Sequence, residues 1–229
     1  MDDRQRRKLD TLSRLDDFGL AHASDFAPNS VGKQLFTEIS ILADRLAGFA
    51  TSQVSGRALA QHGTTTRTDA REDLRMDLEA MYRTARALAN ENPGIEAKFR
   101  FPFRASDQEL LAAARSIAEN AVPFSAQFIA FELPATFLED LNEDILTLET
   151  AISTQATGRS KSAAARAEIN EGLEAADIAR RKLNAIVKNK YANDPGVLAE
   201  WVSASHTVRA PRYAQPPPVP TGQPSVNPA

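Results

Sequence analysis

Few side chains of this chain could bind a metal ion or move a proton. The sequence contains three histidines, His22, His62 and His206, and no cysteine. A di-iron site in a helical bundle needs Glu-x-x-His pairs on two helices, and none of the three histidines follows a carboxylate by three positions. Without cysteine there is no thiolate metal site and no thiol nucleophile. The sequence therefore predicts no metal site, no cofactor and no catalytic residue.

Acidic residues gather at the start of one predicted helix. They are Glu139, Asp140, Glu143 and Asp144. Their spacing forms two carboxylate pairs four residues apart, and such pairs could hold a divalent cation through oxygen ligands. Acidic side chains in the first turn also interact favourably with the helix dipole. We prefer this second interpretation.

One short segment alternates aromatic and cationic side chains, which is typical of extended backbone. Its residues are Lys98, Phe99, Arg100, Phe101, Phe103 and Arg104. The rings could stack on nucleic-acid bases while the cations meet phosphates. They could equally close the open end of a helical bundle, with the charged heads reaching water. A contact edge for a protein partner lies between these alternatives, and the segment is our candidate interaction site.

Other familiar motifs are absent or weak. Gly32-Lys33 lacks the glycine and the serine or threonine of a phosphate-binding loop. The sequence has no nucleophile elbow and no dinucleotide fingerprint, so an enzyme is not the leading expectation. The basic start, Arg4 to Lys8, could seek an anionic partner or form a solvated helix end.

The composition is that of an ordinary globular protein. Of 229 residues, 42% are apolar and 25% are charged, and the net charge is −3. This balance argues against a dedicated nucleic-acid binder, which normally carries a basic excess. No stretch approaches the roughly 18 apolar residues of a membrane span, and no signal-like block follows the charged start. We expect a cytoplasmic protein without a membrane partner.

Apolar residues recur at helical spacing along most of the chain. The predicted helices cover residues 3–26, 30–62, 68–90, 106–128 with a kink at Pro123, 136–155, 160–191, and a short stretch from Pro195. A polar break at residues 63–66 and another at Gly158 separate the longer ones. Long helices joined by short breaks form antiparallel bundles. The prediction is all-α: an up-down bundle of about six long helices plus a short C-terminal helix.

The second half of the chain resembles the first. Leu35, Ile39, Leu42 and Leu46 recur as Leu141, Ile145, Leu148 and Ile152, at an offset of 106 residues. Gly56-Arg57 recurs as Gly158-Arg159 at an offset of 102, and Asn92-Pro93-Gly94 as Asp194-Pro195-Gly196. Two tandem three-helix repeats, 1–105 and 106–207, would explain this match. Unrelated amphipathic helices also align on their leucines, so both explanations stay open.

Residues 1–207 are predicted to form one helical domain, and residues 208–229 a flexible proline-rich tail. Six of the thirteen prolines lie in the last fifteen residues, a composition typical of extended chain. The leading functional expectation is a non-enzymatic protein that acts through protein–protein contact or self-association. One alternative is an enzyme or small-ligand binder with a polar pocket between helices. The other is weak nucleic-acid binding through residues 98–104.

Overall fold

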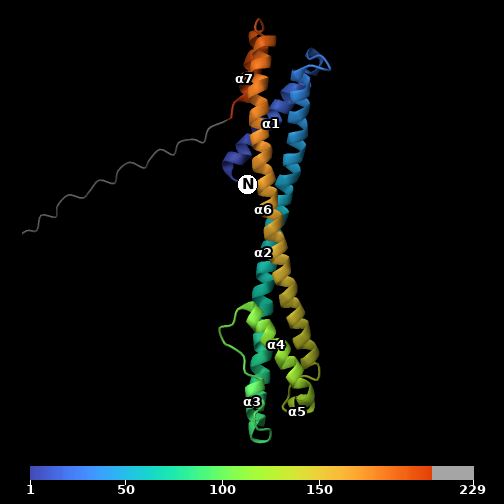
Figure 1. Ribbon diagram of the computed structural model, residues 1–229, viewed down its shortest axis with the longest axis vertical. Helices are drawn as coiled ribbons and strands as arrows, with labels where there is room; N and C mark the ends of the chain where they lie inside the picture. The colour runs from blue at the N-terminus through green and yellow to red at the C-terminus, as the bar shows by residue number, and fades with distance from the viewer. Residues whose placement is uncertain (208–229) are drawn as a thin grey trace, which may run out of the picture.

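The protein is a long, narrow helical rod (Figure 1). The computed structural model describes residues 1–207, and within that range it contains helices and connecting turns but no strand. The all-helical class with about six helices, predicted from the sequence, is confirmed. The proposed tail at 208–229 lies outside the described residues, and the assignment of residues 1–207 to a single domain stays a prediction.

The rod is built on two long helices, with shorter ones at each end. The α-helices are α1 (Asp3–Ala21), α2 (Val31–Ala87), α3 (Ile95–Lys98), α4 (Asp107–Ala121), α5 (Ser125–Ala130), α6 (Phe137–Lys190) and α7 (Pro195–Ser205). Short 3-10 turns follow α1 at Ala23–Asp25, α2 at Leu88–Asn90 and α4 at Val122–Phe124. α2 and α6 run antiparallel along the whole rod (Figure 1).

The helix breaks predicted at residues 63–66 and at Gly158 are wrong. α2 continues for 57 residues and α6 for 54, so α2 alone spans about 85 Å at a rise of roughly 1.5 Å per residue. Thr64 and Thr65 do not interrupt α2, because their hydroxyl groups donate to carbonyl oxygens four residues earlier. The glycines remain helical because the partner helix occupies the space that a side chain would take.

Helix ends agree with the sequence only in part. A capping box begins α4, since the Ser106 hydroxyl accepts from the Glu109 amide and the Glu109 carboxylate accepts from the Ser106 amide. Thr136, which precedes α6, makes no such side-chain cap. Thr136 has ψ near 1°, whereas a capping side chain needs the extended backbone usual at that position. The predicted first helix ends at Ala21 instead of residue 26.

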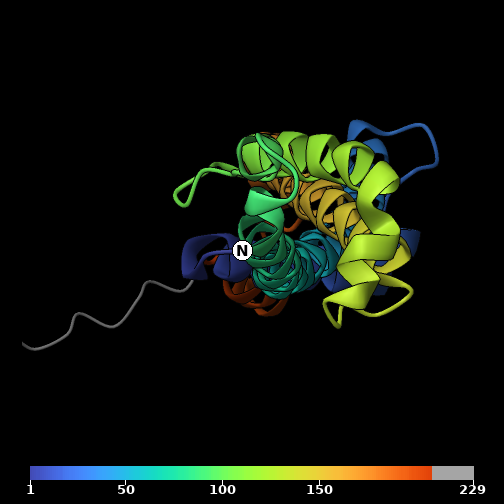
Figure 2. The same ribbon diagram turned by 90° about the horizontal axis from the view of Figure 1, so that it is seen from below.

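Two separate hydrophobic clusters lie at the two ends of the rod. The proximal cluster joins α1, the start of α2, the end of α6 and α7, and its largest side chain is Trp201. The distal cluster joins the end of α2, α3, α4, α5 and the start of α6, and includes Phe99 and Phe128. Viewed along the rod, α4 and α5 lie around the paired long helices (Figure 2).

Between the clusters only α2 and α6 remain, and we call residues 47–68 and 150–167 the waist. Buried positions continue here at the three- and four-residue spacing of a coiled coil, but they hold Gln53, Gly56 and Gly63 of α2, and Gln155 and Gly158 of α6. A Cβ atom added to Gly158 would lie 2.4 Å from the backbone nitrogen of Ala60. The two backbones therefore pack directly on each other.

None of the helices within residues 1–207 combines the length and the apolar character needed to span a membrane.

Candidate functional site

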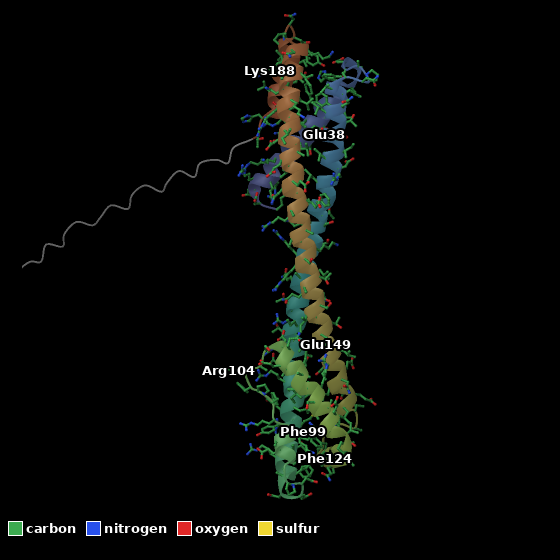
Figure 3. The ribbon with its side chains drawn as sticks, in the orientation of Figure 1. Glu38, Phe99, Arg104, Phe124, Glu149 and Lys188 are labelled. Atoms are coloured by element: carbon green, nitrogen blue, oxygen red, sulfur yellow. The ribbon has the colours of Figure 1, made fainter. Side chains whose placement is uncertain are left out.

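The candidate segment 98–104 connects α3 to α4 at the distal end. Lys98 is the last residue of α3, and residues 99–106 form neither helix nor strand. The loop leaves the body of the rod, and Arg104 lies on its outer side while Phe99 lies within the distal end (Figure 3). The predicted departure from helix is therefore present from Phe99 onward.

The three rings of the segment have three different environments. Phe99 is fully buried and its ring centroid lies 5.0 Å from that of Phe128. Phe101 is half-buried against the same distal cluster. Phe103 is 71% exposed, and the guanidinium of Arg75 lies 4.6 Å from its centroid. The structure thus does not bring the rings to one surface, and Phe99 makes the contacts of a core residue.

The cations of the segment have different surroundings. Arg100 and Arg104 are exposed, and Lys98 places its ammonium 5.7 Å from the ring centroid of Phe124. A row of stacked bases needs several accessible aromatic faces, and Phe103 alone is exposed here. The geometry fits a cap over the distal cluster better than a base-stacking platform.

An ion-pair group that sequence reasoning missed holds the end of this loop. The carboxylate of Asp107, the first residue of α4, accepts from both Arg67 and Arg71 of α2. Arg71 also donates to the carbonyl oxygen of Ala105. The Asp107 side chain is only 10% exposed, so these charge-assisted bonds fix the start of α4 against α2.

The acidic residues noted at the start of α6 face acidic residues of α2. Burial, together with the negative charges of Asp144, Asp140 and Asp73, raises the pKa of Asp77 to about 6. Burial likewise raises the pKa of Asp144. Among the described residues no group of three or more histidine, aspartate or glutamate side chains could hold a metal ion. The like charges of this cluster repel one another, and partial burial strengthens the repulsion.

The proximal end carries a polar network around His22. The two ring nitrogens of His22 lie 3.2 Å from carboxylate oxygens of Asp25 and Glu200. The hydroxyl of Tyr191 donates to Asp25 at 2.7 Å, and the hydrogen bonds from Tyr191 and His22 lower the pKa of Asp25. The ring of Trp201 is fully buried and packs α7 on the rod. These contacts join α1, α6 and α7.

Two grooves open on the waist. One, of about 250 Å³, is lined mainly by threonines together with His62, Glu143 and Leu146. The other, of about 520 Å³, is lined by Arg57, Arg159, Arg166, Ser162 and Asn170 with small alanines between them. We call the second one the arginine groove. Sequence reasoning noted Arg57 and Arg159 only as markers of a repeat. The signal that it missed is the absence of aspartate and glutamate from residues 47–68 and 150–167.

The chain was compared with protein-family models, with curated proteins and with solved structures. None of these comparisons finds a match.

Proposed function

We propose that the protein is a non-enzymatic helical rod that acts by contact, with a second copy of itself or with another protein. The observation that supports this is the placement of two separate clusters at opposite ends of two uninterrupted helices. Such an arrangement sets a fixed distance, of about 85 Å along α2, between two contact surfaces. A rod of this kind suits a spacer or an adaptor.

The distal tip is the end best suited to contact. Ile129 of α5 and Phe131, just after α5, are 41% and 45% exposed, and Val122 in the 3-10 turn before α5 is 62% exposed. Glu132 follows with a φ of 67°, a left-handed conformation that is uncommon for residues other than glycine. Exposed apolar side chains at a strained turn are typical of surfaces that bind a partner.

An internal duplication of residues 1–105 and 106–207 is part of this proposal. Gln53 and Gln155 are both buried in the waist, and Gly56 and Gly158 approach each other's helices there. Both pairs have the offset of 102 residues found in the sequence. A duplicated helical hairpin would generate a rod with two similar ends. The cytoplasmic location expected from the sequence stays a prediction.

The test is native mass spectrometry of the full chain, purified gently from its own host. We expect a mass of two or more times the chain mass of 24.9 kDa, or the chain mass plus that of a second protein. Paired substitutions Ile129→Ser and Phe131→Ser should then weaken the assembly, whereas Val54→Ser on the waist should not. A bare monomer in every preparation would contradict the proposal.

A further inference from the structure

The waist differs in charge from the rest of the molecule. Residues 47–68 and 150–167 contain no aspartate or glutamate but four arginines and one lysine. Since the whole chain has a net charge of −3 and the waist contributes +5, the remainder carries −8. The waist is therefore a positive band on an acidic rod, and a charge distribution of this kind attracts anions to one place.

Three of the waist arginines converge on one groove. Arg57 of α2 and Arg159 and Arg166 of α6 line the arginine groove and are exposed. None of the three makes an ion pair within residues 1–207, whereas Arg67 outside the groove is paired with Asp107. The pKa of the Asp2 carboxyl is lowered first by the hydrogen bond from the Gln5 amide and also by the charge of Arg166, so one carboxylate lies in the vicinity, but it forms no ion pair with the groove arginines.

The close approach of the backbones explains why these arginines share a groove. Arg57 follows Gly56 and Arg159 follows Gly158, and each glycine lies against the backbone of the opposite helix. Three alanines, Ser162 and Asn170 form the remaining lining. No aromatic or branched apolar side chain lines the groove, so the guanidinium groups stay open to a ligand.

Polar groups add hydrogen-bond donors to the arginine groove. The hydroxyl of Ser162 lines it, and so does the amide of Asn170. The Asn170 oxygen accepts from the Gln5 amide at 2.7 Å, which leaves the Asn170 NH₂ group to donate into the groove. The start of α1 lies nearby, since the charges of Arg57 and Arg166 contribute, after burial, to the lowered pKa of the Met1 amino group.

We propose that the arginine groove is a binding site for a small, multiply charged phosphate compound. Guanidinium groups bind phosphate oxygens through paired hydrogen bonds, and a volume of about 520 Å³ falls within the size range of small-ligand pockets. The inference concerns a site on the waist and does not depend on the contact function proposed for the ends.

A small ligand fits the surroundings better than a nucleic acid or a membrane. The waist is roughly 30 Å long at 1.5 Å per residue, and a longer polyanion would meet acidic residues beyond it, among them Asp69, Asp73 and Glu168. The waist contains two helices whereas both ends contain more. A flat lipid surface would therefore meet the wider ends before the groove.

The test is titration calorimetry of the full chain with sodium tripolyphosphate at low ionic strength, where screening is weak. We expect saturable binding of one ligand per chain, weakened about tenfold by Arg159→Gln because a charge-assisted bond is lost. The triple substitution Arg57→Gln, Arg159→Gln and Arg166→Gln should abolish binding. Glutamine keeps the helix propensity of these exposed positions, so the fold should be unchanged.

Arg181→Gln is the matched control, because Arg181 is an exposed arginine of α6 outside the waist. It removes one positive charge and should leave the affinity unchanged. Absence of saturable binding would overturn the proposal, and so would equal affinity in the triple variant. Equal affinity for citrate would remove the preference for phosphate, and tighter binding of a DNA duplex would overturn the choice of a small ligand.

Discussion

The ends and the waist of the rod use the same two helices in different ways. At the ends, the inward positions of α2 and α6 hold leucine, isoleucine and phenylalanine, and a third helix packs on them. In the waist the same positions hold glycine, alanine and glutamine, and no other helix covers them. Two paired helices can bury large side chains along a coiled-coil seam, but this two-helix segment places small side chains and glutamine there. It gains packing through close approach of its backbones instead.

The two parts therefore contribute differently to the fold: the ends supply hydrophobic burial and the waist supplies a rigid connection. The ends bury large apolar side chains and so supply most of the hydrophobic free energy of folding. The waist buries little apolar surface, and its continuity depends on helix hydrogen bonds and on glycines that permit contact. Substitutions at the ends and in the waist should therefore act through different mechanisms.

The largest effect should come from an end cluster. Trp201→Ala removes a fully buried ring that contacts Phe18 and donates to Asn184. We expect a loss of about 3–5 kcal/mol in the free energy of unfolding, typical of a large buried ring replaced by alanine. Chemical denaturation measures this. Val202→Ala, at a 59% exposed neighbour, is the control and should change stability little.

The waist should respond to the addition of a single methyl group. Gly158→Ala places a Cβ atom 2.4 Å from the backbone nitrogen of Ala60, and the helices must separate. We expect a loss of about 2–3 kcal/mol, as for overpacking elsewhere. Thermal denaturation followed by circular dichroism reports the change.

Gly48→Ala is the matched control for this prediction. Gly48 lies in α2, and an added Cβ would meet no atom within 4 Å. Alanine is the better helix former, so this variant should gain about 0.5–1 kcal/mol. Both glycines lie in the waist, and only Gly158 lies against the opposite helix. Equal stabilisation of both variants would contradict the close backbone packing of the waist.

The junction between the waist and the distal end should respond less strongly. Asp107→Asn removes the charge that joins α4 to Arg67 and Arg71. We expect a loss of about 1–2 kcal/mol, since the arginines are partly exposed and water weakens the pair. The loss should shrink at high salt because ions screen the interaction. Asp69→Asn, at an exposed position, serves as the control, and an effect independent of salt would rule out the electrostatic explanation.

The smallest effect concerns the acidic cluster of the distal end. The folded pKa of Asp77 is raised to about 6, above the unfolded value. Protonation therefore stabilises the fold, and this contribution is lost as the pH rises through about 6. Asp77→Asn should gain about 1 kcal/mol at neutral pH, after allowance for partial exposure. The melting temperatures of the variant and the natural protein should draw together as the pH falls below 6 and should converge near the ordinary carboxyl pKa of 3.8. A constant difference at every pH would contradict this.

Much of the fold follows from apolar spacing in the sequence. The leucines and isoleucines from Leu35 to Leu46 predicted helix, as did the proline that starts α7. The two interruptions were misjudged because glycine and threonine usually mark turns. At Gly63 and Gly158 the competing factor is tertiary, since each lies against the backbone of a helix about a hundred residues away. A single sequence does not show that these two segments lie in contact.

For the candidate sites too, the sequence predicted local structure but not tertiary contacts. Spacing predicted an unusual segment at 98–104, but it did not distinguish the burial of Phe99 from the exposure of Phe103. The arginine groove was missed because Arg57 and Arg166 are more than a hundred residues apart and meet only when α2 and α6 pair. A count of acidic residues along the sequence would have found the positive waist without the structure.

The central claim is that α2 passes through the waist without interruption and keeps the two ends apart. The most direct test is the distance between spin labels at Thr37→Cys and Thr68→Cys, two exposed positions of α2 in a chain without cysteine. A continuous helix predicts one narrow distribution near about 47 Å, from a rise of roughly 1.5 Å per residue. A broad distribution at shorter distances would show a break in α2 and would contradict the account.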